Sequence, residues 1–147
     1  MNNKTNGSNC LRRFLILATA LTAVTANAEA PKKIGWVDPV EQNIEGWTVQ
    51  VDPALLSGEY QEEGAKALKM LANHLQRIAI LVPEKPLRKM RKLGIRIERD
   101  HPELKNMQYH PEVGWLNEHG YDPRLVKQVH IPFAAELLSR EEMLKIG

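Results

Sequence analysis

One long helical pattern constrains the fold of this chain more than any other feature. Residues 59–82, EYQEEGAKALKMLANHLQRIAILV, repeat apolar side chains at spacings of three and four, the period of an amphipathic α-helix. Acidic residues gather at the start of the segment, where they favour the helix dipole, and Pro83 ends it. A single apolar stripe has to be covered by a sheet or by a second helix, so the pattern predicts a layered domain.

Short segments on both sides of this helix alternate apolar and polar residues and predict β-strands. Within one of them, Ile95 and Ile97 face one side and Arg96 and Glu98 face the other. We therefore expect an α+β fold, in which one long amphipathic helix packs against a small sheet of about three short strands. The predicted strands are residues 47–53, 93–100 and 128–132, with 107–109 as a further short candidate, and short helices are expected over 84–92 and 133–138.

The first 28 residues have the layout of a secretory signal peptide: a basic start, an apolar run over 14–26 and a small-residue cleavage site that ends at Ala28. The apolar run is short for a membrane span, so we expect cleavage after Ala28 and export, with no stable membrane anchor. Cleavage removes three basic residues and changes the net charge from +2 to −1, which argues against a nucleic-acid partner. Cys10, the single cysteine, also leaves. Residues 29–46 are expected to form a linker or a loosely held arm.

The segment NMQYHPEVGWLNEHGYDP, which begins at Asn106, is rich in aromatic residues and histidines. In one interpretation, Tyr109, Trp115 and Tyr121 form an aromatic cluster beneath a loop. In the other, Met107, Gln108, Tyr109 and His110 form an exposed edge strand that binds an extended peptide by strand addition. These four residues are the candidate substrate-binding residues, and the sequence alone favours the structural interpretation.

Motifs for catalysis are missing from the chain. No histidine begins a His-Glu-x-x-His pattern, and neither a serine elbow nor a glycine-rich phosphate loop is present. His101, His110 and His119 could meet at a metal only if the fold brings them together. His74 lies along the apolar stripe and suits a structural role. The basic run from Lys85 to Lys92 suits a solvated helix face, with an anionic surface partner as the alternative.

Four segments in this order, EGWTVQVDPALLSGE, ALKMLANHLQRIAILVP, MQYHPEVGWLNEHGYDP and VHIPFAAELLSRE, resemble a family of exported bacterial zinc-metallopeptidase-like proteins of the zincin type. The resemblance covers about 100 residues, from Gly46 to Leu144. It implies that residues 47–147 form an incomplete zincin-like domain. It also implies that a zinc-binding His-Glu-x-x-His helix follows the segment similar to LLSREEMLK, and that an edge strand, here Met107 to His110, borders the substrate cleft.

The sequence therefore predicts the N-terminal portion of a secreted zinc metallopeptidase-like protein, inactive as given because the motif helix is missing. Ser139 and Glu142 fit a capping box for one more helix. Zinc and a peptide or protein substrate are expected for the complete protein only. The alternative is a self-sufficient exported module that binds peptides along its edge strand. Because the stripe of the long helix needs more cover than this chain provides, we expect a marginally stable or partly open fold.

Overall fold

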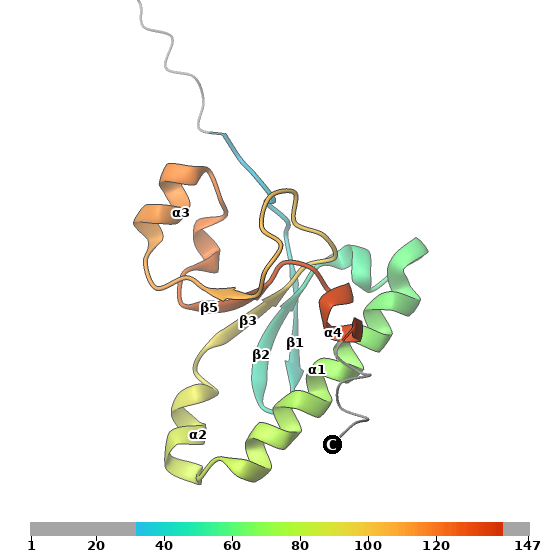
Figure 1. The fold of residues 1–147 in the computed structure, drawn as a ribbon, viewed down its shortest axis with the longest axis vertical. Helices are drawn as coiled ribbons and strands as arrows, with labels where there is room; N and C mark the ends of the chain where they lie inside the picture. Colours follow the sequence, from blue (N-terminus) through green and yellow to red (C-terminus); the bar gives the residue numbers. More distant parts are fainter. Residues whose placement is uncertain (1–31, 140–147) are drawn as a thin grey trace, which may run out of the picture. The chain divides into compact units, whose positions relative to one another are not determined.

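The computed structural model describes residues 32–139, whose centre is a five-stranded sheet. The strands are arranged in the order β1-β2-β3-β5-β4, with the three inner strands parallel and both edge strands antiparallel to their neighbours (Figure 1). Their bounds are β1 Val40–Ile44, β2 Trp47–Val51, β3 Gly94–Ile97, β4 Gln108–Tyr109 and β5 Gln128–Ile131.

The helix predicted over residues 59–82 is present as α1, Gln61–Leu81, preceded by a 3₁₀ turn, η2, at Gly58–Tyr60. Its stripe buries Ala67, Leu71 and Leu75 against the sheet, and α4 lies beside it (Figure 1). The other helical segments lie between strands, except α4, which follows β5. They are η1 Pro53–Leu55, α2 Glu84–Met90, α3 Val113–His119, η3 Pro123–Leu125 and α4 Ala135–Ser139.

Alternation along the inner strands divides the sheet into an apolar face and a polar face. The apolar side chains of β2, β3 and β5 point toward α1, and those of Val49, Val51 and Ile97 are fully buried. On the opposite face the same strands carry Gln50, Arg96 and His130. The predicted alternation of β3 is therefore present. Its polar side is not solvated, because Arg96 and Glu98 are 0% and 2% exposed.

The interpretation of residues 29–46 as a linker or arm is corrected for residues 40–44, which form β1. This strand escapes a search for alternation because its side chains are polar or exposed. It becomes a strand through its partner β2, to which it is joined by a two-residue turn with positive φ at Glu45 (52°) and Gly46 (87°). Two positive φ angles define the turn that matches strand twist in hairpins.

Residues 32–38 pack over the polar face of the sheet. The Ile34 N–H donates to the Gly120 carbonyl at 2.8 Å, and the Val37 carbonyl accepts from Arg96 at 2.7 Å. Ile34 also belongs to a second, smaller apolar cluster with Leu116, Tyr121 and Leu125. This segment therefore belongs to the same folded unit as the sheet.

The fold is α+β, as predicted, while the expected count of about three strands is wrong because both edge strands add to it. Two predictions fall outside the described residues: the signal peptide with cleavage after Ala28, and the capping-box helix after Ser139, whose Glu142 is not described. None of the helices within residues 32–139 is both long enough and apolar enough to cross a membrane.

Candidate functional site

β4 lies at the open edge of the sheet and leaves one residue with its backbone groups facing outward. His110 directs both of its backbone groups toward β5: its N–H donates to Gln128 at 3.4 Å, and its carbonyl accepts from Lys127 at 2.7 Å. Because successive residues of a strand point their backbone groups in opposite directions, the N–H and C=O of Tyr109 face away from β5. An extended peptide could bind these two groups.

The four predicted substrate-binding residues lie on different sides of this edge. Met107 faces the apolar side of the sheet, whereas Gln108 and His110 lie on the polar side with His130. Tyr109 is 47% exposed. Gln108, Tyr109 and His110 line a pocket of about 310 Å³, which is completed by Pro111, Glu112 and Trp115.

The predicted aromatic cluster forms without Tyr109. The Trp115 ring lies 5.2 Å from the ring of Tyr121 and 4.4 Å from that of His119, and it stacks on His110 at 5.8 Å. α3 places Trp115 and ends at Gly120, whose φ of 74° and close approach to the Lys32 backbone exclude a side chain. The pocket beside β4 therefore has one wall that is held in place by ring contacts.

A buried charge network lies behind the pocket on the polar face. The Arg96 side chain donates to Glu98 at 3.1 Å and to Gln50 at 3.3 Å, and it lies 3.8 Å from Asp122. His130 continues the network, since its Nε2 lies 3.6 Å from Glu98 and its Nδ1 lies 3.4 Å from Nε2 of His110. A chain of polar groups thus connects the interior to the pocket wall at His110.

Burial shifts the titration of this network. It lowers the pKa of His110 below 6.5, and the neighbouring imidazoles of His130 and His101 lower it further. Burial also lowers the pKa of His101, against the opposing charge of Glu98. Burial alone would raise the pKa of Asp122, but hydrogen bonds from Arg124, with the charges of Arg124 and Arg96, outweigh it and hold the pKa below its ordinary value.

The metal hypothesis on His101, His110 and His119 does not match the geometry. His119 turns away and bonds the Trp115 carbonyl through Nδ1 at 2.8 Å, while His130 is the histidine that approaches the other two. His101 Nδ1 accepts from the Leu104 backbone N–H at 2.9 Å and so stabilises a turn. Within residues 32–139, no three His, Cys, Asp or Glu side chains are arranged to hold a metal ion. Residues 32–139 therefore do not by themselves fit a zinc site.

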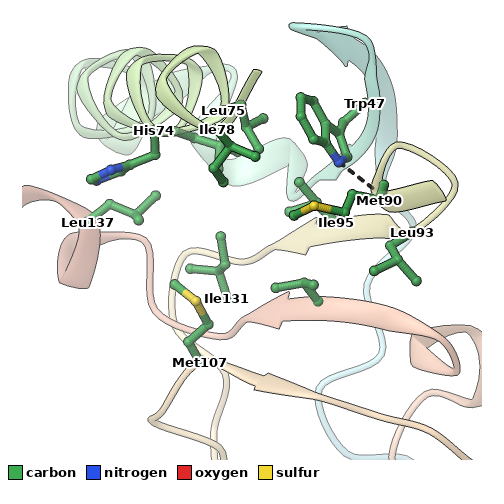
Figure 2. Close-up of a pocket in the computed structure, with 12 residues that line it drawn as sticks. Trp47, His74, Leu75, Ile78, Met90, Leu93, Ile95, Met107, Ile131 and Leu137 are labelled. Atoms are coloured by element: carbon green, nitrogen blue, oxygen red, sulfur yellow. Dashed lines mark hydrogen bonds between the residues drawn. The ribbon is translucent and has the colours of Figure 1, made fainter. Parts of the chain in front are cut away.

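An apolar groove of about 320 Å³ opens on the other face of the sheet, between α1, α2 and the strands (Figure 2). Ile78 and His74 of α1 line one side, and Ile95, Val129 and Ile131 of the sheet line the floor. Trp47 closes one end, and its indole N–H donates to the Met90 carbonyl at 3.2 Å. Leu137 of α4 and Met107 stand at the opposite end (Figure 2). His74, predicted to be structural, thus lines the groove.

Sequence patterns did not reveal the groove or the buried network. The groove is made by residues that read individually as core positions. One available signal for the network is the pair Arg96 and Glu98, which alternate with apolar residues and were predicted to share one face of the strand. Comparisons with protein-family models, with curated proteins and with solved structures find no match to this chain.

Proposed function

We propose that this chain is the N-terminal portion of an exported zinc metallopeptidase-like protein, in which it provides the sheet and the substrate-side edge strand. The open apolar groove is the observation that carries the proposal. Its floor is the apolar face of β3 and β5, its wall is the stripe of α1, and a helix is the element that covers such a surface in layered domains.

The position of α4 supports a helix as the missing cover. α4 packs against α1, and its Leu137 lines the groove. A segment that continues beyond Ser139 therefore starts at the groove rim. In the family that the sequence resembles, the helix with the His-Glu-x-x-His motif follows the segment similar to residues 137–145. We infer that this helix fills the groove and faces the edge strand.

The chain by itself is expected not to hydrolyse peptides. Its sequence contains no His-Glu-x-x-His motif, and a zinc peptidase needs such ligands together with a general base for the metal-bound water. The residues of this chain would position a substrate, with the outward N–H and C=O of Tyr109 bonding to its backbone.

Reading the coding DNA beyond codon 147 in all three frames tests the proposal. We expect a His-Glu-x-x-His helix within a few tens of codons. The extended protein should bind zinc and hydrolyse unstructured peptides, and replacement of the motif glutamate by glutamine should abolish hydrolysis while zinc stays bound. A stop in every frame without the motif contradicts the proposal.

The second candidate function is a self-sufficient module that binds extended peptides at β4. The outward backbone groups of Tyr109 and the pocket beside them favour it. Tyr109→Pro removes the outward N–H and should abolish peptide binding without unfolding the protein, because proline is tolerated where a strand edge faces solvent. Gln108→Pro is the control, since its N–H faces β5 and its loss should also destabilise the sheet. Unchanged binding by Tyr109→Pro excludes strand addition.

A further inference from the structure

The corner where α1 passes into α2 combines exposed aliphatic side chains with a concentration of positive charge. Ile80 and Leu81, in the last turn of α1, are 76% and 75% exposed, more than any other large apolar side chain of the described residues. Residues 77–92 contain six basic side chains and a single acidic one, although the whole chain carries a net charge of only +2. Figure 1 shows that, among the described residues, α2 and the end of α1 lie at the opposite end from α3.

Ile80 and Leu81 belong neither to the apolar core nor to the lining of the groove. The buried stripe of α1 runs through Ala67, Leu71 and Leu75 and continues to Ile78, which lines the groove. At 100° per residue, Ile80 points about 160° and Leu81 about 60° away from Ile78, and neither lines the groove. Exposing two adjacent apolar side chains to water is unfavourable, so binding to a partner that buries them lowers the free energy.

The positive charges beside the pair are largely unpaired. Arg77, Lys85, Lys89 and Lys92 form no ion pair within residues 32–139, and Arg88 lies 3.6 Å from Glu84 in an exposed i,i+4 pair. Lys85 and Lys89 lie one turn apart on α2, the helix that follows Leu81 in the chain. Such a surface attracts a dense negative charge and repels a second copy of itself.

From this combination we propose that the α1–α2 corner is a peripheral membrane-binding surface for bilayers rich in anionic phospholipid. Ile80 and Leu81 enter the boundary between headgroups and acyl chains, while the exposed lysines and arginines of residues 77–92 bind the headgroup phosphates. Nucleic acid would satisfy the charges alone and leave the aliphatic pair in water. Binding of this kind is reversible and does not depend on a membrane span. The edge strand β4 stays accessible, since it is not part of this corner.

Flotation of the full chain with sealed vesicles tests the proposal. Vesicles of phosphatidylcholine with about one third phosphatidylglycerol should bind the protein on the order of tenfold more strongly than pure phosphatidylcholine vesicles, and added salt should release it. Ile80→Ser with Leu81→Ser, and separately Lys85→Ala with Lys89→Ala, should each lower binding to the anionic vesicles about tenfold. Val40→Ser, which changes an exposed apolar side chain on β1, is the matched control and should bind as the parent does.

A local probe separates this surface from binding by the N-terminal residues. Ile80→Cys, made in a Cys10→Ser chain and labelled with a polarity-sensitive fluorophore, should shift to shorter emission wavelengths with anionic vesicles. The same label at Val40→Cys should not shift. An unshifted label at position 80, or equal vesicle binding by the Ile80→Ser, Leu81→Ser variant, overturns the proposal. A dimer that these two serines dissociate, without vesicle binding, assigns the surface to a second copy instead.

Discussion

Arg96 is stable in the interior only because its charge is paired and its N–H groups are hydrogen-bonded. Glu98, Asp122, Gln50 and the Val37 carbonyl surround it, and the side chain is fully buried. Arg96→Ala should lower the free energy of unfolding by about 3–5 kcal/mol, because buried Glu98 loses its hydrogen-bonded cation and Asp122 keeps only Arg124. Urea denaturation measures this loss. Arg88→Ala breaks an exposed pair and should cost about 0.5 kcal/mol or less. Similar costs for both substitutions contradict the buried network.

The imidazoles of His101 and His110 make stability depend on pH. Burial lowers both pKa values in the folded protein below the ordinary value of 6.5, so the unfolded chain takes up protons first as the pH falls. The free energy of unfolding should be highest above pH 6.5 and should fall as the pH drops from there through the lowered pKa values of the folded state. His110→Gln should weaken this dependence. Equal urea midpoints on both sides of this range contradict the prediction.

Two helical glycines show that position within an element decides the effect of one methyl group. A Cβ on Gly64 of α1 would lie 1.9 Å from the Leu55 carbonyl oxygen, where α1 packs on η1. Gly64→Ala should therefore lower the melting temperature despite the higher helix propensity of alanine. Gly114→Ala in α3 meets nothing within 4 Å and should stabilise the protein by up to about 1 kcal/mol. Thermal melts of the two variants, shifted in opposite directions, check this; equal shifts contradict it.

Elements with strong periodicity were predictable from the sequence, and elements defined by their neighbours were not. α1, β2, β3 and β5 carry their pattern in their own residues, because each buries one apolar face. β1 has no such face. Its hairpin turn places Glu45 at positive φ, a conformation that the residue type does not predict. β4 is two residues long and is defined by its pairing with β5. Local sequence therefore predicted the layers, while the edges of the sheet required the tertiary pairing.

Within residues 32–139, the sheet itself leaves two surfaces that a single folded unit does not require. One is the apolar groove over β3 and β5, and the other is the open edge at Tyr109. The sequence offered the edge strand over Met107 to His110 as one of two interpretations and favoured the structural one. Alternation along the strand places Met107 and His110 on opposite sides, but which side meets the apolar groove depends on the register with β5.

An open groove should make the stability of the chain sensitive to whatever fills it. The groove is an apolar space of about 320 Å³ whose lining side chains are left without a packing partner. We therefore expect a low melting temperature, and we expect a fluorescent apolar dye to bind the native protein. A dye that binds the folded state alone raises the melting temperature with its concentration, because ligand binding shifts the unfolding equilibrium.

Val129→Asp, on the groove floor, should abolish dye binding. Val40→Asp, exposed on β1, is the control and should leave it unchanged. A cooperative melt well above room temperature without dye binding would show that the groove is closed in solution, and the proposed docking helix would then lose its support.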